Sequence, residues 1–175
     1  DFSVRNGTEP LAHRPIVCGL GPAGLFAALL LARQGYRPIV LERGPALDER
    51  VKAVEHFSAT GELNENANIQ FGEGGAGTFS DGKLNTVIKD GSGRRTEVMR
   101  TFVEYGADPS IMYINKPHVG TDVLSGIVRN MREDIKRLGG EVHFDSLFTG
   151  YDQITQDEVC VHIKNLSDGS EKEYR

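Results

Sequence analysis

Positive charge and long apolar runs are scarce in this sequence. Its 20 lysine and arginine residues are outnumbered by 25 aspartate and glutamate residues, which gives a formal net charge of −5. General nucleic-acid binding needs clustered basic side chains, so we expect no nucleic-acid partner. The longest apolar run, residues 25–32, is far shorter than the roughly 20 residues of a membrane helix. We therefore expect a cytoplasmic protein without a membrane partner.

Cysteine is also rare. The two cysteines, Cys18 and Cys160, lie in separate apolar, strand-like runs and form no C-x-x-C pair. The five histidines are scattered without metal-ligand spacing, so the sequence predicts no metal site. We expect both thiols to be buried and free in a reducing compartment.

Glycine is the abundant residue, at 21 of 175 positions. The glycines have no fixed period, which excludes a collagen-like chain. They gather in residues 19–24 and 72–82, which indicates two places where the backbone comes close to another group.

The hydrophobic pattern predicts alternating strands and helices, and therefore an α/β domain. The longest predicted helix, residues 121–138, has an N-cap at Thr121, a stop at Gly139-Gly140 and one apolar stripe formed by Leu124, Ile127, Val128, Met131, Ile135 and Leu138. The predicted helix over residues 48–60 has Val51, Val54 and Phe57 on one side. Residues 43–140 are read as a long insertion, and residues 146–175 as an antiparallel meander. The predicted strands are residues 15–19, 37–41, 141–145, 159–164 and 171–175; the predicted helices are residues 22–34, 48–60, 96–105 and 121–138.

The strongest motif is the sequence Gly19-Leu-Gly21-Pro22-Ala23-Gly24, which fits G-x-G-x-x-G between a strand and a helix. Gly19 permits a tight turn, Gly21 lets a pyrophosphate approach the backbone, and Gly24 lets the helix pack against the strand. Pro22 suits the first helical turn. The helix N-terminus then presents free N–H groups to phosphates. The motif predicts a Rossmann-like dinucleotide site.

Glu42 ends the second predicted strand, 21 residues after Gly21. A carboxylate at this place accepts hydrogen bonds from the ribose hydroxyls of an adenosine and repels a 2′-phosphate. FAD and NAD share this fingerprint. The next parallel strand arrives only at Glu141, and the long insertion before it favours FAD, with an NAD-binding module of a dehydrogenase as the alternative.

Two stretches resemble a known family. Residues 68–84 (NIQFGEGGAGTFSDGKL) and residues 116–122 (KPHVGTD) are similar to a bacterial family of FAD-dependent, or NAD(FAD)-utilising, dehydrogenases. Residues 17–24 with Glu42-Arg43-Gly44 resemble the wider glutathione-reductase-like flavoproteins with two dinucleotide-binding domains. The resemblance implies FAD binding and a flavin-dependent oxidoreductase. It also places Arg43 beside the adenosine and Arg50 near the cofactor. The alternative for Arg50 is a plain surface ion pair.

The second glycine cluster is expected to form another backbone cradle. Gly74, Gly75 and Gly77 permit positive φ, so that consecutive N–H groups beside Ala76 and Thr78 converge on an anion or on flavin carbonyls. The alternative is a flexible loop.

No catalytic residue is assigned, because the flavin carries the redox chemistry in such enzymes. Asp81, Lys83 and His118 are candidates for a place near the ring, against ordinary loop polarity. His143 and His162 are interpreted as structural.

A sheet of this type needs two more strands after the meander, so we expect an incomplete chain. We assign residues 1–14 to an extension and residues 15–175 to the FAD-binding domain, which is expected to be inactive alone. The full-length protein is expected to act on a small-molecule substrate, with NAD(P)H as a candidate electron partner. A flavin-binding redox sensor without its own turnover is the further alternative.

Overall fold

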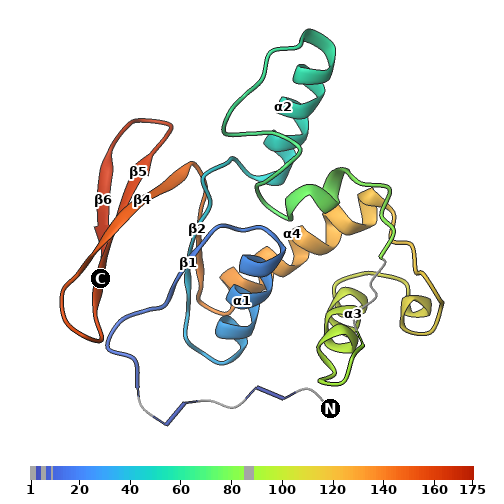
Figure 1. The fold of residues 1–175 in the computed structure, drawn as a ribbon, viewed down its shortest axis with the longest axis horizontal. Helices are drawn as coiled ribbons and strands as arrows, with labels where there is room; N and C mark the ends of the chain where they lie inside the picture. Colours follow the sequence, from blue (N-terminus) through green and yellow to red (C-terminus); the bar gives the residue numbers. More distant parts are fainter. Residues whose placement is uncertain (1–2, 5–6, 9, 85–88) are drawn as a thin grey trace.

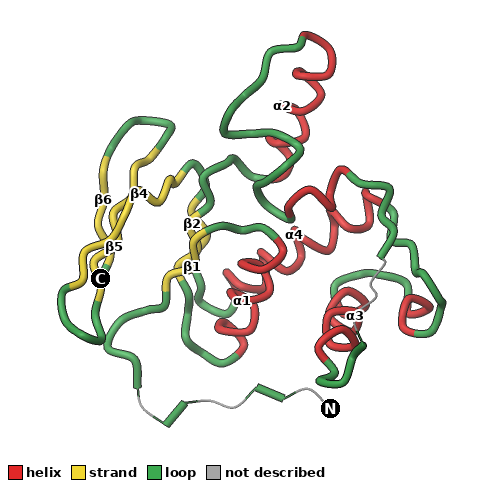
Figure 2. Tube along the Cα trace, in the orientation of Figure 1, coloured by secondary structure: helices red, strands yellow, loops and turns green. Residues whose placement is uncertain are grey.

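The computed structural model describes residues 3–4, 7–8, 10–84 and 89–175. It confirms a mixed α/β architecture with a parallel sheet (Figures 1 and 2). In chain order the elements are β1 (Ile16–Cys18), α1 (Pro22–Arg33), β2 (Ile39–Leu41), α2 (Leu47–Thr60), the 3₁₀ helix η1 (Gly75–Phe79), α3 (Arg94–Glu104), the 3₁₀ helix η2 (Pro109–Met112), α4 (Thr121–Arg137), β3 (Glu141–His143), β4 (Ser146–Gln153), β5 (Val159–Asn165) and β6 (Glu171–Tyr174).

The parallel sheet has the strand order β1-β2-β3. β1 pairs with β2 through Ile16 and Ile39, and β2 pairs with β3 through Ile39 and Glu141. Helix α1 connects β1 to β2, whereas about 100 residues separate β2 from β3, as the sequence predicts. β1 is an edge strand within the described part of the chain.

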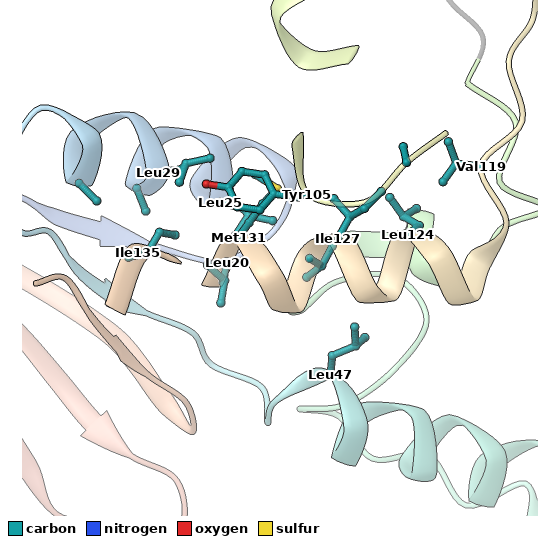
Figure 3. Close-up of a cluster of buried hydrophobic side chains, with 14 of the residues drawn as sticks. Leu20, Leu25, Leu29, Leu47, Tyr105, Val119, Leu124, Ile127, Met131 and Ile135 are labelled. Atoms are coloured by element: carbon teal, nitrogen blue, oxygen red, sulfur yellow. The ribbon is translucent and has the colours of Figure 1, made fainter. Parts of the chain in front are cut away.

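The main core lies between one face of this sheet and helices α1 and α4. Figure 3 shows α1 and α4 side by side with their apolar side chains between them. Val17, Val40 and Val142, which occupy corresponding positions on the three strands, pack against this cluster. The short β1–α1 and α1–β2 connections hold the helix close to the sheet, which fixes the turn that precedes α1.

Helix α4 follows its predicted stripe closely. Five of the six predicted residues are buried and Leu138 is partly buried; the five are Leu124, Ile127, Val128, Met131 and Ile135. The predicted cap was wrong by one position. Gly120 is the N-cap, and Thr121 is the first helical residue. Gly139, with φ of +89°, ends the helix as expected.

Strands β4, β5 and β6 form an antiparallel meander on the other side of the sheet. Val161 and Ile163 of β5 pack against Ile39 and Leu41 of β2. Cys160 is buried, as predicted, but Cys18 is exposed. The prediction failed for Cys18 because apolar neighbours in sequence do not reveal that β1 lies at the sheet edge.

Helix α2 extends away from the sheet (Figure 1). Of its predicted apolar side, Val54 is buried and Val51 partly buried, whereas Phe57 is 38% exposed. The last turns of α2 therefore lie beyond the main core. Among the described residues, no helix is both long and apolar enough to cross a bilayer.

Tyr105 ties α3 to both core helices. Its hydroxyl donates to Asp134 of α4 at 2.6 Å and accepts from Arg33 of α1 at 2.9 Å. Desolvation, followed by the hydrogen bond to Asp134, raises the pKa of Tyr105 to about 12. The folded-state pKa exceeds that of an unfolded tyrosine, so the protonated Tyr105 hydroxyl stabilises the folded state. This contribution is complete below about pH 10 and is lost as the pH rises through the folded-state pKa.

We therefore expect one tyrosine to titrate late in an ultraviolet absorbance titration of the folded protein. Tyr105→Phe should remove that late step and lower the free energy of unfolding at pH 7 by about 1–2 kcal/mol. The exposed Tyr151 is the control, because Tyr151→Phe should leave the late step of Tyr105 and the stability unchanged. A late tyrosine that persists in Tyr105→Phe would contradict this interpretation.

Candidate functional site

The turn between β1 and α1 is built from glycine backbone. Gly19 has φ of +92° and donates its N–H to the Leu41 carbonyl of β2 at 2.7 Å. A side chain at Gly24 is impossible without movement, because its Cβ would lie 1.9 Å from the Gly19 carbonyl oxygen. By contrast, a Cβ at Gly21 would meet nothing within 4 Å. The turn is closed where the helix meets the strand and open at Gly21, where a ligand can approach.

The N-terminus of α1 faces the same open space. Pro22 is the first helical residue, and the first intrahelical hydrogen bond runs from the Leu25 N–H to the Gly21 carbonyl. The N–H groups of Ala23 and Gly24 precede that bond, so they belong to the free donors of the helix end. These donors and the helix dipole favour an anion.

Glu42 is held rigidly at the end of β2. Its side chain is buried, and its two oxygens accept the Leu20 N–H at 2.7 Å and the Gly44 N–H at 2.9 Å. A carboxylate has about four acceptor sites, so two hydrogen bonds leave capacity for a ligand. The backbone therefore fixes the Glu42 carboxylate beside the glycine turn.

The second glycine cluster packs onto the first. The Gly74 N–H donates to the Leu20 carbonyl at 2.9 Å. Gly75 has φ of +69°, and a Cβ there would lie 2.6 Å from Cδ of Pro22. This segment is therefore a defined wall beside the N-terminus of α1, and part of it forms the 3₁₀ helix η1.

Arg50 of α2 holds this wall in place. The side chain is fully buried, so the interpretation as a surface ion pair was wrong. Burial lowers the pKa of Arg50, while the carboxylates of Glu42 and Glu73 act in the opposite direction. The guanidinium donates to one hydroxyl and four carbonyls of the same loop: Thr78 Oγ1 at 3.4 Å, Asn68 O at 2.8 Å, Ile69 O at 3.0 Å, Glu73 O at 2.9 Å and Gly75 O at 3.0 Å.

Glu73 links the same loop to α2 and α4. Its fully buried carboxylate accepts the Leu47 N–H at 2.6 Å and is bound by the Arg132 guanidinium at 2.9 Å. Burial raises the pKa of Glu73, and the hydrogen bonds from Leu47 and Arg132 limit the rise. Two buried charged side chains, Arg50 and Glu73, thus organise a loop that has little apolar surface of its own.

These elements enclose a cleft of about 450 Å³, which lies within the usual range for small-molecule sites. Its lining includes seven residues predicted from the sequence: Gly19, Gly21, Pro22, Glu42, Arg43, Gly75 and Ala76. The guanidinium of Arg43 lies over the Phe71 ring, 4.1 Å from its centroid.

The other predicted site residues lie outside the cleft lining. Gly24 and Gly74 allow close packing beside the cleft, because a Cβ at either position would clash, and Arg50 supports the loop that forms a wall of the cleft. Ala23, Gly77 and Thr78 also lie outside the lining. Sequence reasoning missed a set of lining residues on the loop and on the start of β4: Gln70, Phe71, Gly72, Ser146, Leu147 and Phe148. Gly72 began the second glycine cluster, so a signal existed for the loop. The β4 residues carry no motif.

The three candidates for a place near a flavin ring gather elsewhere. Lys83 and His118 form an isolated antiparallel bridge, and the Lys83 ammonium lies 2.8 Å from the Asp81 carboxylate. All three are exposed, and none lines the cleft. The hydrogen bond from Lys83 lowers the pKa of Asp81. Their arrangement is that of a surface ion pair on a loop.

Comparison with known proteins supports the architecture. No family model matches the chain. A protein of Clostridium beijerinckii described as uncharacterised is 57% identical over 167 residues, which are 94% of this chain and 31% of that protein. The chain therefore spans about a third of the length of this relative.

Two solved structures share the fold at low sequence identity. THI4 of Thermovibrio ammonificans is 16% identical, with a TM-score of 0.52 over 89% of this chain and 48% of that one. The fold is Rossmann-like. p-Nitrophenol 4-monooxygenase PnpA of Pseudomonas putida DLL-E4 is 14% identical, with a TM-score of 0.51 over 92% of this chain and 38% of that one.

Proposed function

We propose that the cleft binds FAD and that the chain is the FAD-binding domain, over residues 15–175, of a flavin-dependent oxidoreductase. The observation that carries this proposal is that three glycines and one acid each have a separate structural role at the turn. Gly24 closes the helix onto the turn, Gly21 leaves space for a pyrophosphate, and Gly19 turns the chain. Glu42 holds a fixed carboxylate where a ribose would lie.

The walls of the cleft favour FAD over NAD. A dinucleotide-binding turn needs only the first strand, the first helix and the end of the second strand. Here the cleft continues along Phe71 and Gly72 of the insertion and along Leu147 and Phe148 of the meander. These extra walls come from the long insertion and the meander, the two segments that distinguish this chain from a simple NAD-binding unit. The Arg43 and Phe71 pair adds a flat surface on which an aromatic ring can stack.

The roles of this chain's own residues are binding and orientation. When bound, FAD would supply the redox chemistry. The N–H groups of Ala23 and Gly24 would hold the pyrophosphate, and Glu42 would accept hydrogen bonds from the ribose hydroxyls. The resemblance in residues 68–84 points to the FAD-dependent dehydrogenases as the subfamily. A small-molecule substrate and NAD(P)H as electron donor are proposed for the full-length protein.

The FAD proposal predicts a specific effect of Glu42→Ala. Loss of the carboxylate removes two charge-assisted acceptors for the ribose, each worth about 1.5–3 kcal/mol, so the affinity for FAD should fall by at least tenfold. The measurement is the quenching of flavin fluorescence when the full-length protein, stripped of cofactor, is titrated with FAD.

The control variant is Glu49→Ala, which removes an exposed acid from α2 and should leave the FAD affinity unchanged. FMN, which lacks the adenosine half, should bind far more weakly than FAD to the unmodified protein. Equal affinities for FMN and FAD, or an unchanged FAD affinity in Glu42→Ala, would contradict the proposed orientation of the cofactor.

A further inference from the structure

A second group of chemically reactive side chains lies on the meander, outside the cleft. Cys160 and His162 are two residues apart on β5, so they share one face of the sheet. Val161 and Ile163 point to β2 and fill the core, which places Cys160 and His162 on the outer face. Glu173 of β6 lies directly opposite His162 in the strand register. Two neighbouring strands thus bring a thiol, an imidazole and a carboxylate together.

The distances suit one metal ion. The Cys160 sulfur lies 3.7 Å from one oxygen of Glu173, and Nδ1 of His162 lies 3.3 Å from the other. One ligand atom from each residue lies within 4.8 Å of the others. A tetrahedral zinc ion with ordinary bond lengths would separate sulfur from oxygen by about 3.6 Å and nitrogen from oxygen by about 3.4 Å. Only a small rotation of Glu173, whose side chain is 66% exposed, would direct one oxygen at both partners.

A second acid orients the imidazole. Nε2 of His162 lies 2.9 Å from the Asp152 carboxylate of β4. In zinc sites the nitrogen that does not bind the metal commonly donates to a carboxylate, which fixes the tautomer and ring orientation. With a metal ion bound at Nδ1, Asp152 would accept the Nε2 proton and hold the ring with Nδ1 directed at Glu173. The guanidinium of Arg175 also reaches Cys160, so an incoming ion must displace that contact.

We propose that Cys160, His162 and Glu173 form a zinc-binding site on the outer face of the meander, with Asp152 as the carboxylate that positions His162. The mixture of sulfur, nitrogen and oxygen donors suits Zn²⁺ better than Mg²⁺ or Ca²⁺, which prefer oxygen alone. Three protein ligands leave the fourth position to water or another group. The ion would join β5 to β6. Two of the ligands lie two residues apart on β5, but the third comes from β6. The sequence predicted no metal site because it does not show which acid lies beside β5.

The test is metal binding by the full-length protein after removal of metal with a chelator. Zn²⁺ is titrated by calorimetry, and Co²⁺ is then followed by its thiolate charge-transfer absorbance as a difference spectrum against the metal-free protein. We expect one equivalent of zinc and a cobalt–thiolate band. Cys160→Ser should abolish the band and weaken zinc binding by more than about 100-fold, and Asp152→Asn should weaken it on the order of tenfold while the band remains.

Two matched controls separate this site from other metal ligands. Cys18→Ser removes the exposed thiol, and His143→Gln removes a strand histidine that lies 2.9 Å from Glu141 and belongs to no such ligand cluster among the described residues. Both should bind zinc like the unmodified protein. If Cys160→Ser fails to fold, the same titrations are made with Asp152→Asn and His162→Gln. Asp152 is exposed and His162 is half-buried. No zinc uptake, no thiolate band, or a band that depends on Cys18 overturns the proposal.

Discussion

Gly24→Ala is expected to lower the free energy of unfolding by about 3 kcal/mol, near the upper end of ordinary overpacking. Alanine is better than glycine inside a helix by up to about 1 kcal/mol, so propensity alone predicts a gain. Packing reverses the sign, because the new methyl group would lie 1.9 Å from the Gly19 carbonyl oxygen and 3.0 Å from its carbon. Neither atom belongs to a flexible side chain. The helix and the turn must separate, which also displaces the proposed phosphate donors.

Gly21→Ala is the matched control for Gly24→Ala. Gly21 has φ of −65°, which alanine adopts without strain, and its Cβ would point into open space. Stability should change by less than about 0.5 kcal/mol. FAD affinity should nevertheless fall on the order of 100-fold, because the methyl group occupies the space left for the pyrophosphate.

Urea unfolding and FAD titration of both full-length variants measure the two effects separately. The expected pattern is a stable protein with weak binding for Gly21→Ala and an unstable protein for Gly24→Ala. Equal stability losses in the two variants would show that the close contact at Gly24 is not what makes glycine necessary there.

Arg50→Met is expected to cost about 3–5 kcal/mol, the range for breaking a buried charged network. Methionine fills similar space but donates no hydrogen bond. The carbonyls of Asn68, Ile69, Glu73 and Gly75 would each lose a buried donor. Residues 68–78 would then detach from α1, so the cleft would lose one wall and its affinity for FAD.

The readouts are urea unfolding and amide hydrogen exchange, in which residues 68–78 should lose protection well before the core helices. Arg129→Met is the control. Arg129 pairs with Asp48 on the surface, and such pairs contribute at most about 1 kcal/mol. Unchanged protection of this loop in Arg50→Met would contradict the role assigned to Arg50.

Much of this fold could be predicted because local sequence and tertiary packing agree. The apolar stripe of α4 fits a helix with one buried side, and the glycine motif fits one backbone conformation of the turn. Both signals lie within a few residues of the sequence. The Rossmann-like class and the late arrival of β3 followed from such local signals.

The remaining errors have a common cause, which is contact between distant segments. Arg50 has the sequence context of a surface helix residue, and only the folded loop shows that it is buried among carbonyls. Phe148 enters the cleft because the meander returns to the end of β2. Cys18 is exposed in the described part of the chain because β1 is an edge strand there, which depends on strand order and not on its neighbours in sequence.

The most direct test of the account is identification of the cofactor in the purified full-length protein. The absorbance spectrum is recorded, the protein is denatured, and the released small molecule is identified by mass. We expect the two absorbance bands of an oxidised flavin in the spectrum, and the mass of FAD for the released molecule. A colourless protein that takes up no added FAD but binds NADH would contradict the account, because the glycine turn and Glu42 would then serve a nicotinamide dinucleotide.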